Sequence, residues 1–231
     1  MYSNSIPVLH KLHSVDFFYK DSVDLKSSMC ENNFETYFKS LNCNQDDCFL
    51  IENSTKGQHK SYHWKNARAG TLTSSSFGTI CKKKPETKPD ILLRSIMGYN
   101  DEFDTAATRW GRSHEPAAKR LYQRRIQITH PGLKLFSSGL VVKPSLPHLG
   151  SSPDGIVDCC KKCAHTKGVL EIKCPYKFRN CSPEEACIDK IFCCSIVNGE
   201  VTLKKKTQLL FPSSRSNGLN RKKWCDFLCG L

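Results

Sequence analysis

Hydrophobic and polar positions alternate most regularly in residues 169–174, where the sequence is Val-Leu-Glu-Ile-Lys-Cys. This two-residue period predicts a β-strand, because successive side chains of a strand point to opposite faces of its sheet. Glu171 and Lys173 therefore share one face, whereas Ile172 points into a core. The strand places a carboxylate and an ammonium group side by side.

Other segments extend the strand pattern. Earlier strands are predicted in residues 136–142 and 149–158, so that residues 159–165 form the tip of a hairpin. Residues 196–205 predict a second hairpin, because Asn198-Gly199 is a turn sequence that joins paired strands.

Helical spacing marks the segment that follows Glu115. The apolar residues at this spacing are Ala118, Leu121, Tyr122 and Ile126. Ser113 is predicted to cap the helix and Pro116 to occupy its first turn, which places Glu115 at the helix start. A carboxylate at that point is available to a nearby site.

Two shorter helices are also predicted. Residues 89–97 form one of them, and its apolar residues are assigned to the core. These residues are Ile91, Leu92, Leu93 and Ile96. Ser182 caps the other helix, with Pro183 and two acidic residues in the first turn.

A further carboxylate, Asp154, lies in the turn-like sequence Ser-Pro-Asp-Gly. On neighbouring strands, Asp154 would converge with Glu171 and Lys173, and Glu115 would add a third carboxylate from the helix. Such oxygen ligands suit a hard cation such as Mg²⁺ or Mn²⁺, and a lysine beside them can hold a water and a phosphate oxygen. The arrangement predicts metal-dependent cleavage of a phosphodiester. Glu-x-Lys alone is equally typical of the solvated face of an ordinary strand.

Three motifs occur in a specific order: Gly-x-x-x-Glu-Pro-x-Ala around Glu115, Ser-Pro-Asp-Gly around Asp154, and Glu-Ile-Lys-Cys-Pro-Tyr from Glu171. Together they resemble the YqaJ viral recombinase family, the lambda-type exonuclease branch of the PD-(D/E)XK nucleases. The resemblance runs from about residue 64 to residue 227. It implies a mixed α/β fold with a restriction-endonuclease-like α-β-β-β-α-β core, in which helices flank a central mixed sheet.

The resemblance also implies roles for these residues. Asp154, Glu171 and Glu115 match the carboxylates of the metal site. Lys173 matches the catalytic lysine, whose task of orienting and deprotonating water favours a lowered pKa. Family members digest one strand of duplex DNA from its 5′ end in recombination or repair, so the implied partner is linear duplex DNA with a free end. Ring-shaped trimers are known in the lambda-type branch, so the resemblance allows a homo-oligomer.

Residues 71–78 match a family segment that reads Arg-Ile-Thr-Ala-Ser-x-Phe-Gly and is used near the DNA end. Thr71 stands where the arginine is expected. Arg68 and Ser75 remain as candidates for phosphate contacts at that end.

The overall charge favours a polyanionic partner. Lysine and arginine number 35 against 22 acidic residues, a formal net charge of +13. Such side chains neutralise phosphates and drive salt-sensitive binding to DNA. Arg120 and Arg124 follow Glu115 and are candidate DNA contacts, although any single basic run is also typical of a solvated helix or hairpin face.

The length of 231 residues suits one domain with an extension. Residues 1–50 are predicted to be an N-terminal extension, helical or partly disordered, and residues 51–231 a nuclease domain that is incomplete at its C-terminal end. No stretch approaches the roughly 20 apolar residues of a membrane helix, and residues 1–20 lack a secretory signal pattern. We therefore expect an intracellular protein, nuclear or cytoplasmic, with no membrane partner.

The 14 cysteines are interpreted as reduced thiols or metal ligands, because disulfides are rare inside cells. One cluster has the spacing of half a structural zinc site. Its members are Cys159, Cys160, Cys163 and His165. The alternatives are tolerated thiols in a hairpin loop and, for the whole chain, a zinc-stabilised interaction protein.

Residues 208–220 depart from the family pattern, which has a Tyr-x-x-Gln-x-Gln helix there. Pro212 and the neighbouring serines make a poor helix. Codons compatible with these residues, read one base later, encode Tyr-Tyr-Phe-Gln-Val-Gln, so a shifted reading frame explains the departure. The coding nucleotide sequence tests this hypothesis. A chain altered in this way would be a weakened or inactive DNA-binding remnant of the nuclease.

Overall fold

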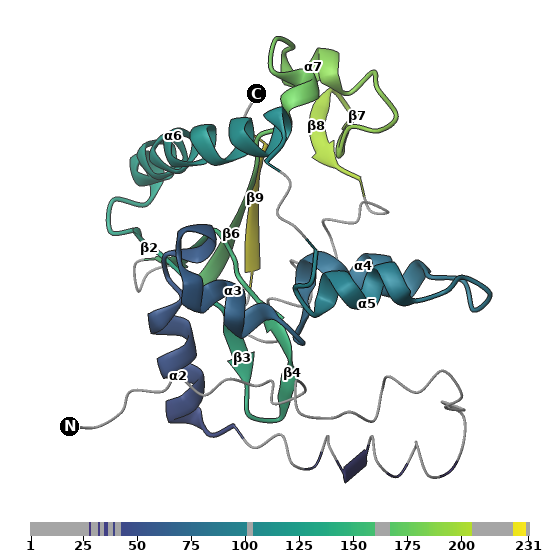
Figure 1. Ribbon diagram of the computed structural model, residues 1–231. Helices are drawn as coiled ribbons and strands as arrows, with labels where there is room; N and C mark the ends of the chain where they lie inside the picture. The colour runs from purple at the N-terminus through teal and green to yellow at the C-terminus, as the bar shows by residue number, and fades with distance from the viewer. Residues whose placement is uncertain are drawn as a thin grey trace.

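The computed structural model describes residues 43–100, 104–159, 167–204 and 224–229, with isolated positions before residue 43 (Figure 1). Most of the predicted N-terminal extension, residues 1–50, therefore lies outside the described residues. The same holds for residues 208–220, where the shifted frame is hypothesised.

A four-stranded mixed sheet forms the centre of the fold (Figure 1). In spatial order its strands are β2 (Lys134–Phe136), β5 (Gly155–Asp158), β6 (Lys167–Lys173) and β9 (Trp224–Cys229). Strand β5 is antiparallel to both β2 and β6, whereas β9 runs parallel to β6. The pairing of β5 with β6 confirms the predicted hairpin, although most of its tip lies outside the described residues.

The long helix α6 (Ala106–Thr129) packs on one face of the central sheet. Buried apolar side chains from the helix, the strands and the turn after the helix form one core. They are Ala118, Tyr122, Leu133, Val157, Leu170 and Ile172. Because Leu170 and Ile172 belong to this core, the Glu171 and Lys173 side chains, which alternate with Ile172, leave the strand on its other face.

A second, three-stranded sheet lies beside the N-terminal helices. Its strands, in spatial order, are β1 (Leu72–Thr73), β4 (Leu146–Ser151) and β3 (Val141–Lys143). The helical layer consists of α2 (Gln45–Ser54), the short 3-10 helix η3 (Gln58–Lys60) and α3 (Tyr62–Arg68). The core between them contains Cys43, Cys48, Ile51, Ala67, Leu140 and Val142. This layer therefore covers the second sheet as α6 covers the first.

Two short segments join the two sheets directly and form the crossings described here, whereas the earlier connection from β1 to β2 runs through helices that include α6. Strand β2 leads through residues 137–140 into β3, and β4 leads through residues 152–154 into β5. The predictions of single strands at 136–142 and 149–158 were therefore wrong. Pro153 has no N–H group to donate to a strand ladder. A side chain at Gly139 would overlap the carbonyl of Glu52, so the chain at this point lies directly against α2.

The remaining elements form two outlying groups. Helices α4 (Ser74–Lys82) and α5 (Asp90–Ile96) extend to the right of the view in Figure 1. A third core lies around Phe178 and Phe192, and this core is completed by Ala186 and Cys194. Its elements are η4 (Tyr176–Phe178), α7 (Pro183–Ala186), β7 (Cys194–Val197) and β8 (Glu200–Leu203).

Two local predictions in the third core are confirmed. Strands β7 and β8 pair antiparallel across Asn198 and Gly199, whose φ angles of 53° and 82° give the left-handed turn that such a hairpin needs. Ser182 caps α7 in a capping box with Glu185.

Two helix predictions were wrong in part. Helix α6 begins at Ala106, capped by Thr105, so Glu115 lies inside the helix and Pro116 is an interior proline. The Ser113 hydroxyl instead donates to the carbonyl of Trp110. Helix α5 forms as predicted, but Ile91 is 81% exposed and Leu93 is 50% exposed, so neither belongs to a core.

The order α6, β2, β5, β6 and then β9 follows the predicted α-β-β-β-α-β core in the elements that the structure describes. Between β6 and β9, the described residues form η4, α7 and the β7–β8 hairpin. Residues 205–223, which also belong to this connection, lie outside the described residues. Within the described ranges, no helix combines the length and the apolar character that crossing a membrane requires.

Candidate functional site

Asp154 lies at the second crossing between the sheets, directly before β5. Gly155 pairs with Leu170, so the antiparallel ladder brings Asp154 opposite Glu171. The backbone N–H of Ile172 donates a hydrogen bond to Asp154 Oδ2 at 2.5 Å. Asp154 and Glu171, the two carboxylates that the sequence predicts to be neighbours, thus meet where β5 begins beside β6.

Glu171 and Lys173 form an ion pair on the strand face opposite Ile172. Lys173 Nζ lies 2.6 Å from Glu171 Oε1, and the side chains are 39% and 15% exposed. Between them, Ile172 is only 4% exposed and packs in the core under α6. The strand therefore has the alternation that the sequence predicted.

The electrostatics of this cluster are dominated by crowded negative charge. Burial, followed by the charge of Glu171, raises the pKa of Asp154 to about 7, and Glu115 adds to the rise. Burial lowers the pKa of Lys173, but Glu171 and Asp154 outweigh it, so the pKa of this lysine is raised. In the protein without bound metal, the neighbouring carboxylates thus stabilise the ammonium form of Lys173.

Glu115 contributes charge from α6 but has a partner of its own. Its carboxylate pairs with Lys119, one turn along the helix, at 2.9 Å. Across the described residues, no three His, Cys, Asp or Glu side chains gather closely enough to hold a metal ion together. The expected set of three carboxylate ligands is thus not assembled here.

Asp154 and Glu171 nevertheless have the chemistry of a Mg²⁺ or Mn²⁺ site. Both supply hard oxygen donors, and Mg²⁺ is commonly bound by one or two carboxylates together with water and substrate phosphates. Burial and the charge of Glu171 disfavour the ionised form of Asp154, and a divalent cation would offset both effects. The residues present therefore fit such an ion.

A second polar cluster surrounds Arg68 at the start of α4. The Arg68 guanidinium donates to the hydroxyls of Thr73 and Ser75, at 3.4 Å and 3.2 Å, and lies 4.2 Å from the ring centroid of Trp64. Burial lowers the pKa of Arg68 to about 10. In the described part of the chain, no carboxylate forms an ion pair with it. The structure thus brings together the two residues that the sequence nominated for phosphate contacts.

Trp64 connects this cluster with the carboxylates. Its indole N–H donates to the hydroxyl of Ser152 at 3.0 Å, two residues before Asp154. Thr71, which replaces the expected arginine, is buried and donates its hydroxyl to the carbonyl of Ala67. Position 71 therefore belongs to the interior rather than to the polar cluster.

The other nominated residues lie elsewhere. Arg120 and Arg124 are exposed on α6, on the side away from its buried residues Ala118 and Tyr122. Cys159 is half-buried beside the core under α6. Cys160, Cys163 and His165 lie outside the described residues, so the zinc hypothesis stays a prediction.

One contributor to the site was not predicted at all. The side-chain amide of Gln58, on η3, donates to the carbonyls of Ser138 and Pro153. Its partners are 80 and 95 residues away in the sequence, so no local pattern could have indicated the contact.

A sequence model of the YqaJ-like viral recombinase domain matches residues 63–195, more than half of the chain. The chain belongs to this family. The YqaJ-like region contains Arg68, Ser75, Glu115 and all of the Asp154–Glu171–Lys173 cluster, and it ends before β8 and β9. Among curated proteins, none matches the chain.

Two solved structures share the fold of this YqaJ-like chain. The crystal structure of LHK-Exo in complex with dAMP matches with a TM-score of 0.52 at 23% sequence identity, covering 73% of each chain. The crystal structure of the alkaline exonuclease LHK-Exo from Laribacter hongkongensis gives a TM-score of 0.51 at 23% identity, again covering 73% of each chain. At this identity the likeness concerns the fold, and it confirms the predicted mixed α/β architecture.

Proposed function

We propose that this chain is a metal-dependent DNA exonuclease that hydrolyses phosphodiester bonds from a free end of linear duplex DNA. The observation that carries the proposal is the meeting of Asp154, Glu171 and Lys173 at the point where β5 begins and β6 ends. Membership of the YqaJ-like family supports it. The similar LHK-Exo structures, named for an alkaline exonuclease and for a complex with dAMP, add support for the class of reaction.

Asp154 and Glu171 are the residues that would hold the divalent cation. When bound, such an ion polarises the scissile phosphate and activates a water for attack on phosphorus. The Ile172 amide keeps one oxygen of Asp154 engaged at 2.5 Å, which fixes the direction of the carboxylate. Glu115 would add negative charge behind these ligands while remaining paired with Lys119.

Lys173 would act in its protonated form. Its pKa is raised by the surrounding carboxylates, so an ammonium group is present at neutral pH. An ammonium group can donate hydrogen bonds to a phosphate oxygen and to the attacking water, and so orient both. We therefore assign Lys173 to positioning and charge stabilisation.

Arg68 would bind a phosphate near the DNA end. A guanidinium carries five donors in a planar fork that matches phosphate oxygens, and Arg68 shares its position with the hydroxyls of Thr73 and Ser75. Its burial without an ion pair to a described carboxylate leaves its charge available to an anion. Attack from the 5′ end, which the family resemblance implies, is part of this proposal.

The test is a degradation assay on end-labelled linear duplex with and without Mg²⁺. Lys173→Ala and Glu171→Gln are expected to lower kcat by about 10²–10³-fold or more, as the loss of a group that stabilises charge in the transition state does. DNA binding should persist, because neither residue supplies most of the positive surface.

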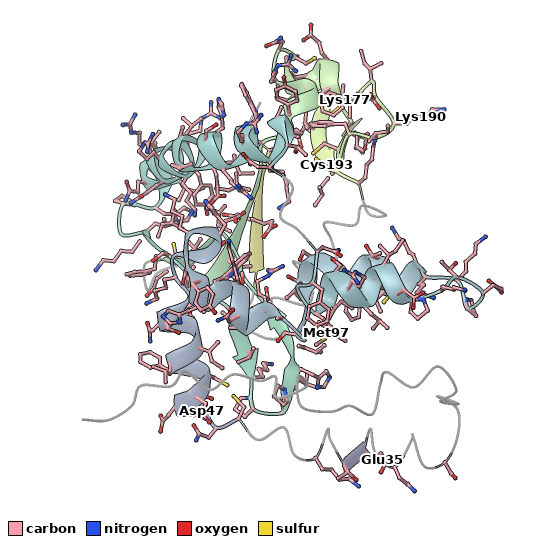
Figure 2. The ribbon with its side chains drawn as sticks, viewed as in Figure 1. Glu35, Asp47, Met97, Lys177, Lys190 and Cys193 are labelled. Atoms are coloured by element: carbon pink, nitrogen blue, oxygen red, sulfur yellow. The ribbon has the colours of Figure 1, made fainter. Side chains whose placement is uncertain are left out.

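Two variants serve as matched controls. Lys177→Ala removes a lysine that pairs with Asp189 at the surface of the third core, in the upper part of Figure 2, and Glu184→Gln changes an exposed acid on α7. Both should retain activity. Unchanged degradation by Lys173→Ala and Glu171→Gln would refute the proposal. DNA binding without any cleavage by the wild type would identify the inactive remnant instead.

A further inference from the structure

The segment that carries Asp154 is hydrogen-bonded to Gln58, a residue of the N-terminal helical layer. The Gln58 side-chain N–H groups donate to the carbonyl of Ser138 at 3.1 Å and to the carbonyl of Pro153 at 3.0 Å. Ser138 and Pro153 are both almost fully buried. The Pro153 carbonyl belongs to the peptide group that leads directly into Asp154.

The two carbonyls lie in the two short crossings that join the sheets directly. Ser138 lies between β2 and β3, and Pro153 lies between β4 and β5. One amide therefore ties together both crossings, and with them the central sheet, the second sheet and the helical layer. Trp64 adds a second tie to the same segment through the Ser152 hydroxyl.

The backbone of Gln58 indicates that this contact is specified by the fold rather than incidental. Its φ angle is +45°, in the left-handed region that side chains other than glycine seldom adopt. Such a conformation persists where the surrounding structure determines it, and it recurs near functional sites. Here the unfavourable backbone accompanies a side chain that reaches two buried carbonyls.

We propose that Gln58 is a positioning residue for the metal site, an inference that rests on the proposed nuclease function. By fixing the peptide between Pro153 and Asp154, Gln58 keeps the Asp154 carboxylate beside Glu171 and under the Ile172 amide. Without the amide this peptide can rotate, and rotation would swing the carboxylate away from its neighbours. Partners that orient metal ligands commonly affect metal affinity or activity by about 10- to 100-fold.

Two variants separate the effect of the Gln58 side-chain amide from the effect of its left-handed backbone conformation. Gln58→Gly removes the amide and relieves the left-handed conformation, so this change favours folding of the turn. Gln58→Glu keeps the size of the side chain but replaces the donor by a carboxylate that cannot donate to the two carbonyls. Asn53→Ala is the matched control, because the Asn53 amide donates to the carbonyl of Phe49 within α2 rather than to a carbonyl of either crossing.

The measurement is Mn²⁺ binding to the full chain by titration calorimetry, with the Mg²⁺ concentration for half-maximal cleavage as a second readout. Both Gln58 variants are expected to raise the Mn²⁺ dissociation constant by about 10- to 100-fold, while the KM for DNA stays unchanged. Asn53→Ala should bind Mn²⁺ as the wild type does. Thermal melting without metal shows how much of each variant is folded.

The outcomes distinguish the inference from the function on which it depends. If folded Gln58→Gly and Gln58→Glu bind Mn²⁺ with the wild-type constant, Gln58 has a structural role only and the inference is overturned. A lower melting temperature with an unchanged Mn²⁺ constant overturns it in the same way. If the wild type itself neither binds Mn²⁺ nor cleaves DNA, the proposed function fails and the inference fails with it.

Discussion

Asp154 is the carboxylate of the site whose ionised form is disfavoured by its surroundings. Burial and the charge of Glu171 raise its pKa from 3.8 to about 7 in the protein without bound metal. Between these two values the folded state holds a proton that the unfolded state has released. The free energy of unfolding therefore falls as the pH rises from 3.8 to about 7. Above this range the loss is complete. Below pH 3.8 there is no loss, because Asp154 is then protonated in both states.

Asp154→Asn is expected to stabilise the protein without bound metal. The substituted amide cannot ionise, yet its oxygen still accepts the hydrogen bond from the Ile172 amide. In EDTA at about pH 8, the melting temperature should exceed that of the wild type by about 2–4 °C for each kcal/mol of repulsion relieved. At about pH 4 the two proteins should melt together, because the Asp154 carboxyl is then protonated in the folded wild type.

Mg²⁺ provides the control for this prediction. The ion should raise the melting temperature of the wild type at about pH 8 and have little effect on Asp154→Asn, since only a state that binds the ion is stabilised by it. Identical melting of the two proteins in EDTA across this pH range would show that Asp154 is not under electrostatic strain.

At the residue scale, the sequence predicted contacts that local geometry determines. Glu171 and Lys173 share a face because they are two residues apart on a strand, and Asp154 reaches them through the hairpin pairing of β5 and β6. Gln58 escaped prediction because its role depends on two chain crossings that are remote in sequence. The raised pKa of Lys173 also depended on the final spacing of three carboxylates, which no motif defines.

At the scale of elements, the predictions that were confirmed depend on short-range sequence signals that no neighbouring signal contradicts. The Asn198-Gly199 turn and the Ser182 capping box are short-range features, and both formed as expected. The start of α6 was misplaced because Ser113 and Pro116 look like a helix start, whereas Thr105 supplies a cap earlier in the chain. Tertiary packing of the helix on the sheet overrides the poor propensity of an interior proline.

The crossing at Gly139 explains why one predicted strand became two, and it supplies a test of the packing. A Cβ atom at this position would overlap the carbonyl of Glu52 and the hydroxyl of Thr55 at the end of α2. Gly139→Ala is therefore expected to destabilise the protein by about 1–3 kcal/mol or more, as overpacking does when backbone must move. The free energy of unfolding, from urea denaturation, is the measurement.

Gly111→Ala is the matched control for Gly139→Ala. Gly111 lies inside α6, and the nearest atom that its Cβ would meet is the carbonyl oxygen of Cys174 at 4.0 Å. Alanine is the better helix former by about 1 kcal/mol, so this variant should be more stable than the wild type. Equal effects of the two substitutions would contradict the close approach of α2 to the crossing.

At the scale of the whole molecule, the net positive charge serves DNA binding in the proposed reaction, whereas the fold assembles the site of cleavage. The net charge of +13 is spread over many elements, whereas the carboxylate cluster lies at one point of the central sheet, where β5 begins and β6 ends. A basic surface attracts DNA of any sequence, and the acidic centre attracts the cation that hydrolysis needs. This division predicts that DNA binding and cleavage respond to different variants and to different ions.

The exposed arginines of α6 test whether DNA lies along that helix. Removing a phosphate contact lowers the slope of log K against log salt concentration by about 0.9, so Arg120→Ala with Arg124→Ala should reduce it by about 2. Lys82→Ala with Lys84→Ala removes the same charge from the exposed end of α4 and should leave the slope unchanged. Fluorescence anisotropy of labelled duplex in increasing salt, with Mg²⁺ omitted to prevent cleavage, measures both. If both double variants reduce the slope equally, net charge alone governs binding. If Arg120→Ala with Arg124→Ala leaves the slope unchanged, this face of α6 does not contact the DNA.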